Sequence, residues 1–185
     1  MELTRDWTRV ALDAGPFFRF GETGCLLDLL TYLGTKAVVT REVETELLRN
    51  ARKDEYAFLR VLQHVQPPLD VVDLNPKSAE ELLDRLRAAR KPGDHPDAHK
   101  GEISTVLLAA EVAHVLVVCD DPLGKRLAKK KTIARLSTVQ LAAELVALGE
   151  LSHEEGLTVF SVSAGGADPK HFDSAVRQAR AALAV

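Results

Sequence analysis

The chain has little of what marks several common classes of protein. Its 185 residues include only two cysteines, Cys25 and Cys119, and aromatic residues make up 5%. Both cysteines stand in apolar segments, so we expect buried free thiols rather than a disulfide framework. Lys and Arg number 24 against 27 Asp and Glu, for a formal charge of −3. This balance disfavours a strongly basic nucleic-acid binder, although a local basic face remains open.

Long apolar runs and nucleotide-binding motifs are also missing. The most apolar stretch, Ile103–Cys119, is interrupted by Glu111 and His114 and falls short of the about 18 apolar residues that a membrane span needs. The opening residues MELTRDWTRV lack the apolar core of a signal peptide. No Gly-rich phosphate loop and no Gly-x-Ser-x-Gly motif is present, which disfavours a kinase or a serine hydrolase. We therefore expect a cytoplasmic protein with no membrane segment.

Short apolar, often β-branched segments alternate with amphipathic helical patterns along the chain. Strands are predicted at Arg9–Asp13, Lys36–Thr40, Leu69–Leu74, His114–Cys119 and Lys131–Ala134. Helices are predicted at Thr23–Leu33, Glu42–Asn50, Glu55–His64, Ser78–Arg90, Gly101–Ala113, Pro122–Lys130, Ser137–Leu148, His153–Val162 and Pro169–Leu183. Strands separated by helices pair in parallel through right-handed crossovers. The pattern predicts a three-layer α/β/α sandwich whose central, mostly parallel sheet has four to five strands, with extra C-terminal helices.

Acidic side chains stand where ligands bind in such a fold, at the carboxyl ends of the strands. Asp13 ends the first predicted strand, and Asp120 and Asp121 follow the most apolar one. Glu46 lies in the helix after the second strand, and Glu102 opens the helix after a Pro-rich loop. The order of these acids on one frame suggests that they meet at one rim of the sheet.

Each acid also has an ordinary structural interpretation. Asp121 precedes a proline and suits a helix N-cap. Glu102, in a first helical turn, is favoured there by the helix dipole. Glu46 suits a surface pair with Arg49 or Asn50. For any single residue these interpretations stay open, and only the set of acids in this order is specific.

Several segments together resemble the PIN-domain nucleases. The first two are LDAGP (12–16), which has the family's first acid at Asp13, and TREVETELLR (40–49), which has Glu46. The third, HKGEISTVLLAAE (99–111), has Glu102 in the Gly-Glu opening of a VapC-like branch. The last two are VVCDDPLGKRLAKK (117–130), which has the acids of the fourth motif, and STVQLAAELVALGEL (137–151), which has the family's helix and glycine turn. Cys119 stands where the family commonly has Thr or Ser, and Asp121 matches the family acid better than Asp120. The resemblance spans 9–151, so we expect a PIN-like domain over 1–151 and a helical extension over 152–185 packed on it.

The resemblance implies a nuclease site built from five acids, namely Asp13, Glu46, Glu102, Asp120 and Asp121. Crowded carboxylates repel one another unless cations neutralise them, and hard divalent ions such as Mg²⁺ or Mn²⁺ suit oxygen ligands. Asp13, Glu102 and Asp121 are expected to be direct metal ligands, with Glu46 and Asp120 binding directly or through water. The expected chemistry is phosphodiester hydrolysis.

The resemblance also implies partners. RNA is the usual substrate of the family, many members are toxins held inactive by an antitoxin protein, and homodimers are common. Lys125 and Arg126 follow the aspartate pair directly and are predicted to contact substrate phosphates. Phe17, Phe18 and Phe20 could stack on bases, but core packing is the preferred interpretation.

Three alternatives remain. A zinc site could be formed by Asp94, His95, Asp97 and His99, although no cysteine pair supports it. The helices within 141–160 could form a helix-turn-helix, but the second helix begins with His153, Glu154 and Glu155 rather than groove-reading side chains. A PIN-like fold could also act as a non-catalytic module that binds protein or nucleic acid.

Overall fold

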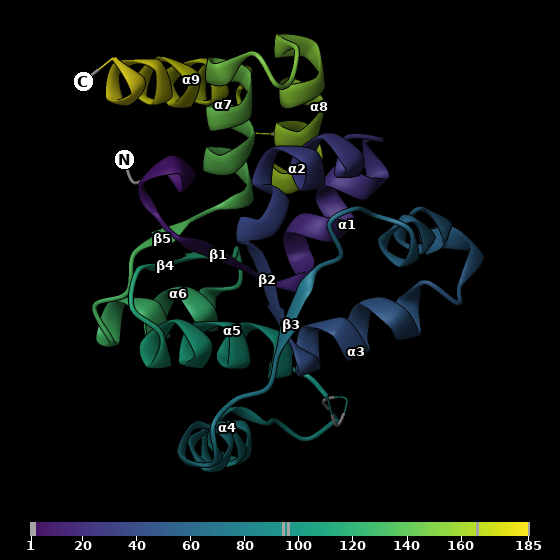
Figure 1. Cartoon of the computed structure of the whole chain (residues 1–185), viewed down its shortest axis with the longest axis vertical. Coiled ribbons are helices and arrows are strands. Elements are labelled where there is room, and N and C mark those ends of the chain that lie inside the picture. Colours follow the sequence, from purple (N-terminus) through teal and green to yellow (C-terminus); the bar gives the residue numbers. More distant parts are fainter. Residues whose placement is uncertain (1–2, 94, 96, 166, 185) are drawn as a thin grey trace.

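A parallel β-sheet organises the protein. The computed structural model describes residues 3–93, 95, 97–165 and 167–184. Five strands pair in the order β3-β2-β1-β4-β5, and every pair is parallel (Figure 1). The strands are β1 (Arg9–Leu12), β2 (Ala37–Thr40), β3 (Asp70–Val72), β4 (Val115–Val118) and β5 (Arg135–Leu136). The predicted sheet is confirmed.

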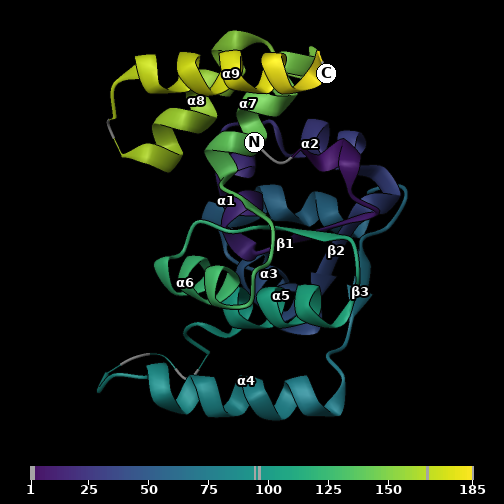
Figure 2. The same cartoon turned by 90° about the vertical axis from the view of Figure 1, so that its left-hand side faces the viewer.

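Helices cover both faces of the sheet, so the predicted α/β/α sandwich is confirmed as well. The helices are α1 (Ala14–Glu22), α2 (Leu26–Leu33), α3 (Arg41–Asn50), α4 (Pro76–Ala89), α5 (Lys100–Glu111), α6 (Pro122–Lys130), α7 (Thr138–Leu148), α8 (His153–Ala164) and α9 (Pro169–Leu183), with 3₁₀ turns η1 (Thr4–Asp6), η2 (Gly34–Lys36) and η3 (Asp54–Gln63). Helices α1, α2 and α7 to α9 lie on one side of the sheet, and α5 and α6 lie on the other with α4 outermost (Figure 2).

The alternation of side chains along the strands explains the two cores. Val10 and Leu12 join the core beneath α1 and α7, whereas Ala11, between them, joins the core beneath α5 and α6. Strand β4 is buried along its whole length. A strand covered on both faces carries an unbroken apolar run, as the sequence does here.

The chain after Asp13 departs from the sequence-based expectation. The residues Ala-Gly-Pro suggest a tight turn, but α1 starts at Ala14 without an intervening turn. Pro16 falls in the first helical turn, where no amide hydrogen is needed. Phe17 and Phe20 are fully buried in the core, which confirms core packing for both. Helix α1 therefore fixes the position of Asp13 at the end of β1.

Three further elements differ from the prediction in their bounds or type. The last strand is not at 131–134 but at Arg135–Leu136, because Thr132 adopts φ 56° in a turn that closes α6. Helix α4 starts at Pro76, before the predicted start at Ser78, and its N-cap is Asn75, which accepts from the Ser78 N–H at 2.9 Å. The segment after α3 forms the 3₁₀ turn η3 with a kink at Tyr56 instead of an α-helix.

The C-terminal helices pack on the body of the protein through α7 and α8, both of which contact α1. Ser137 caps α7 in a reciprocal capping box, and residues 141–146 of this helix are all buried. Phe172 of α9 is fully buried against Phe160 of α8. The start of α8 is held by His153, whose Nε2 lies 2.8 Å from Asp173 Oδ1. Within the described ranges, no helix combines the length and the apolar character that crossing a membrane requires.

Candidate active site

The strand order places the topological switch point of the sheet between β1 and β4. These two strands are neighbours, and the chain continues outward from them in opposite directions, to β2 and β3 on one side and to β5 on the other. Ligands bind in open parallel sheets where the order reverses in this way. Asp13 follows β1, and its N–H donates to Val118 O of β4 at 3.1 Å. The acid at the end of β1 is thereby fixed beside the end of β4.

Asp13 is a buried carboxylate with acidic neighbours. It is 7% exposed, and although it occupies the N-cap position of α1, it makes no side-chain capping bond. Burial raises the pKa of Asp13 well above its usual value. The nearby carboxylate of Glu102 raises this pKa further, as do Glu46 and Asp121, while the Ala14 backbone amide acts in the opposite direction. Helix capping therefore does not account for Asp13.

Glu46 of α3 and Asp13 both approach Gly101 of α5. A Cβ added at Gly101 would lie 2.9 Å from Asp13 Oδ1 and 3.3 Å from Glu46 Oε2. The two carboxylates thus converge on the first turn of α5, where the lack of a side chain leaves them room. Burial raises the pKa of Glu46, Glu102 raises it further, and the charge of Arg49 lowers it. Arg49 forms its ion pair with Asp97, at 2.8 Å, and acts on Glu46 only through its charge, so the expected surface pair gives way to the proximity of the other acids.

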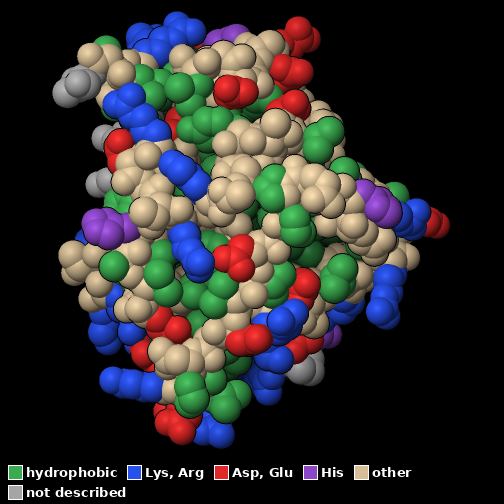
Figure 3. Space-filling model, viewed as in Figure 1, with side chains coloured by type: hydrophobic (Ala, Val, Ile, Leu, Met, Phe, Trp, Pro, Cys, Tyr) green, Lys and Arg blue, Asp and Glu red, His purple; other side chains and the backbone are tan. Residues whose placement is uncertain are grey.

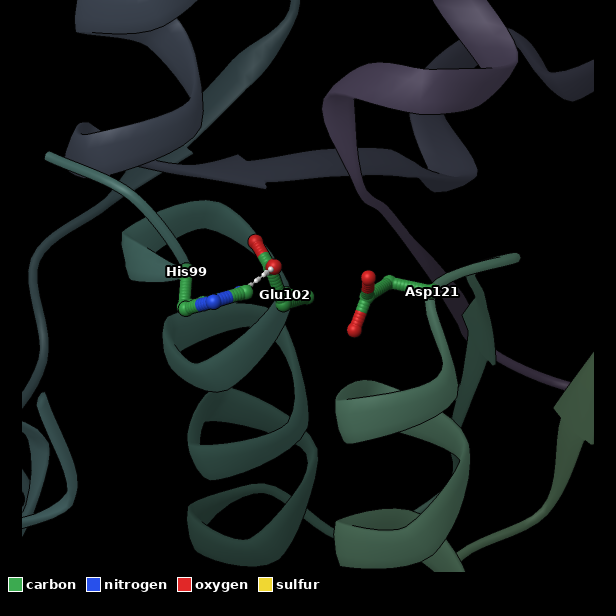
Figure 4. A group of neighbouring side chains, drawn as sticks. All are labelled: His99, Glu102 and Asp121. Carbon is green, nitrogen blue, oxygen red and sulfur yellow. Dashed lines mark hydrogen bonds and ion pairs between the residues drawn. The ribbon is translucent and has the colours of Figure 1, made fainter. Parts of the chain in front are cut away.

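Glu102 and Asp121 form the other half of the cluster, and His99 joins them (Figure 4). One ligand atom from each of these three side chains lies within 4.8 Å of the others. Asp121 also caps α6, because its Oδ1 accepts from the Leu123 N–H at 2.6 Å. A carboxylate has a second oxygen, so capping and metal binding are compatible.

Asp120 lies apart from that group. Its Oδ1 accepts a hydrogen bond from the Thr138 N–H at 3.0 Å, at the start of α7. The adjacent residue, Asp121, is the one that faces Glu102. Of the two consecutive aspartates, the structure therefore brings Asp121 into the cluster with Glu102 and gives Asp120 a bond to the neighbouring helix.

Cys119, which stands where the family commonly has a hydroxyl, packs beneath the cluster. It is fully buried, and a Cβ added at Gly124 would lie 3.1 Å from its Sγ. Burial raises the pKa of Cys119 to about 12, with a further contribution from Asp13. The side chain is therefore a neutral thiol, a weaker hydrogen-bond donor than the expected hydroxyl.

Basic side chains lie on two sides of the acids. Lys125 and Arg126 extend from α6, and neither side chain forms a hydrogen bond or ion pair with the residues that the structure describes. A cavity of about 200 Å³ beside Glu46 is lined by Arg41, Arg49 and Lys100 among others. Figure 3 shows Lys, Arg, Asp and Glu side chains intermingled on the lower half of the face, where α3 and α4 lie. The sequence does not reveal the basic residues of this cavity, because they come from two different helices.

One residue of the alternative zinc site, Asp94, lies outside the described residues. Asp97 accepts from Lys100 Nζ at 2.6 Å and from Arg49 Nη1 at 2.8 Å. Among the side chains that are described, His99 groups with Glu102 and Asp121 rather than with His95 and Asp97. The sequence suggests His99 only as a zinc ligand, and its contact with the acids is the functional feature that the sequence does not reveal.

Comparison with known families agrees with this geometry. A family model described as a PIN domain matches residues 9–159. The chain belongs to the PIN-domain family. No match was found among curated proteins or among solved structures. PIN domains are generally nucleases, and the matched range contains every acid of the cluster. The matched PIN domain ends within α8, beyond the expected boundary at 151, and the division of the chain at that point stays a prediction.

Proposed function

We propose that this PIN domain is a metal-dependent endoribonuclease that hydrolyses phosphodiester bonds at the carboxyl ends of β1 and β4. The observation that carries the proposal is the convergence of four carboxylates from four separate segments, with Asp13 buried at 7% exposure among the other three. Like charges brought together out of water are costly unless a cation neutralises them. Such a cluster does not stabilise the fold, whereas a metal site needs the negative charge that it supplies.

The donor set fits a divalent cation. Carboxylate oxygens suit Mg²⁺ and Mn²⁺, and Asp13, Glu102 and Asp121 are the residues proposed to hold the ion. Glu46 adds negative charge from α3 through its approach to Asp13. A bound ion would lower the pKa of a water molecule and stabilise charge on the leaving oxygen during hydrolysis.

The remaining residues have supporting roles in this proposal. Asp120 is a positioning residue, because its bond to Thr138 ties the end of β4 to α7 and thereby holds Asp121 in place. Lys125 lies one helical turn after Asp121 on α6, close enough to Cys119 for its charge to lower the pKa of that thiol. Lys125 and Arg126 are therefore placed to attract and orient the phosphates of an RNA strand.

Cleavage of a mixed-sequence single-stranded RNA tests the proposal, with DNA of the same sequence as a second substrate. We expect cleavage of the RNA with Mn²⁺, none with EDTA, and none by Asp13→Asn or Glu102→Gln. Asp54→Asn is the control, because Asp54 is fully exposed in η3. Mn²⁺ should also raise the melting temperature, by mass action.

Two results would contradict the assignment. Cleavage that continues in EDTA, or that survives both Asp13→Asn and Glu102→Gln, would remove the acids from the chemistry. A wild-type protein that neither cuts nor gains thermal stability from Mn²⁺ would instead favour the non-catalytic binding module.

A toxin role and an antitoxin partner rest on the family resemblance alone and need their own experiment. Induced expression of the chain in a bacterial host should arrest growth, and Asp13→Asn should abolish the arrest. Normal growth under wild-type expression, with cleavage activity demonstrated in vitro, would retain the nuclease and discard the toxin.

A further inference from the structure

One side chain in contact with the acid cluster is not an acid. His99 Nδ1 lies 2.7 Å from Glu102 Oε1, and both residues come from the start of α5 (Figure 4). His99 and Glu102 share with Asp121 the grouping of ligand atoms within 4.8 Å. Two ligands at right angles around one ion, each about 2.1 Å from it, are separated by about 3 Å. The hydrogen bond between His99 and Glu102 holds these two atoms slightly closer than two neighbouring ligands of one ion, so a bound ion would take the place of the shared proton.

The backbone at His99 is unusual for a residue with a side chain. Its φ is 68° and its ψ is 4°, in the left-handed region, and it occupies the N-cap position of α5 without making a capping bond. A left-handed conformation is unfavourable for a residue that carries a Cβ atom. In this conformation the ring turns back over the first turn of its own helix, toward Glu102. The imidazole is half-buried there, with its side chain 32% exposed.

We propose that His99 is a nitrogen ligand of the metal ion and that it makes the site selective for Mn²⁺ over Mg²⁺. This inference rests on the proposed metal-dependent function. Imidazole suits first-row transition ions, whereas Mg²⁺ prefers oxygen ligands and retains its waters. A site of carboxylates alone would bind either ion. The histidine is therefore the residue that makes the site prefer Mn²⁺ to Mg²⁺.

The substitution His99→Asn tests the inference, because asparagine tolerates left-handed backbone but supplies no imidazole. The matched control is His114→Asn. His114 also has positive φ, at 59°, but precedes β4 at the opposite end of the sheet. Titration calorimetry with Mn²⁺ and with Mg²⁺ gives both affinities. We expect the preference for Mn²⁺ to fall by about 10–100-fold in His99→Asn and to be unchanged in His114→Asn.

A spectroscopic measurement identifies the ligand directly and needs no RNA. Electron spin echo modulation of the Mn²⁺-loaded protein should show coupling to ¹⁴N in the wild type and in His114→Asn, and should lose it in His99→Asn. Mn²⁺ binding without ¹⁴N coupling, or with an unchanged preference in His99→Asn, would overturn the role of His99 and leave the nuclease proposal standing. No Mn²⁺ binding by the wild type would overturn both.

Discussion

The Oδ1 atom of Asp120 accepts a hydrogen bond from the Thr138 N–H at 3.0 Å, whereas the next residue, Asp121, belongs to the acid cluster. The bond ties the loop after β4 to the first turn of α7. Because consecutive residues in this loop point in different directions, two neighbouring aspartates have different surroundings. Their roles can therefore be separated by identical substitutions.

We expect Asp121→Asn to abolish Mn²⁺ affinity and RNA cleavage, and Asp120→Asn to reduce both by less than about tenfold. Asparagine keeps an oxygen that can accept from Thr138 or from Leu123, so either variant retains its backbone bond and only the charge is removed. Calorimetry and cleavage rates on the two proteins measure the difference. Equal losses in both variants would show that Asp120 also binds the ion.

The raised pKa of Asp13 predicts a pH-dependent cost to stability in metal-free protein. Above that pKa the folded state holds a buried charge, so the destabilisation is fully present there and is relieved as pH falls from the raised value toward the ordinary one. Asp13→Asn removes this charge. Without metal, the variant should melt higher than the wild type at neutral pH, by about 2–4 °C for each kcal/mol gained.

The difference in melting temperature should shrink as pH is lowered, because the wild-type carboxyl then takes up a proton. Thermal melts in EDTA across a pH series measure it. Asp54→Asn removes a fully exposed carboxylate and is the control, which should not melt higher than the wild type. An Asp13→Asn protein that melts lower than the wild type at every pH would mean that the carboxylate stabilises the fold and is not strained by burial.

The sequence is informative about the acids because their positions follow from local patterns. Asp13 and Asp121 each follow an apolar strand, and parallel strands bring their carboxyl ends together. His99 cannot be assigned in this way, because its contact with Glu102 depends on a left-handed backbone at the end of a loop. Likewise, α1 is not predicted because Gly-Pro suggests a turn, and only the burial of aromatic side chains such as Phe17 makes the helix favourable.

Substrate binding is expected to depend on Lys125 and much less on Lys130. Both lysines lie on α6, but Lys130 is at the far end of the helix, about 7 Å further along its axis from the cluster. In an Asp13→Asn background, which leaves the RNA uncut, Lys125→Ala should weaken binding. It should also reduce the slope of the logarithm of the binding constant against the logarithm of the salt concentration, here called the salt slope, by about 0.7. That is the value for one phosphate of a single strand that is no longer neutralised.

Fluorescence anisotropy with labelled RNA over a range of salt concentrations measures both quantities. Lys130→Ala removes the same charge from the same helix and should leave the salt slope unchanged. If the two variants lower the slope equally, binding responds to the net charge of α6 and not to a phosphate held at Lys125.

The space at Gly101 gives the last prediction. Alanine is favoured over glycine inside a helix by about 1 kcal/mol, so Gly101→Ala in α5 should by propensity alone stabilise the protein. The added Cβ, however, would lie 2.9 Å from Asp13 Oδ1 and must displace that carboxylate. We expect Mn²⁺ affinity and RNA cleavage to fall by about tenfold or more, with the fold retained.

Gly15→Ala in α1 is the matched control, because a Cβ there meets no atom within 4 Å. It is also a helical glycine and is separated from Asp13 by a single residue, yet it should leave metal affinity unchanged. Calorimetry and circular dichroism on the two variants separate loss of the site from loss of the fold. Wild-type Mn²⁺ affinity in Gly101→Ala would mean that the approach of Asp13 and Glu46 to this glycine is not needed to bind the ion.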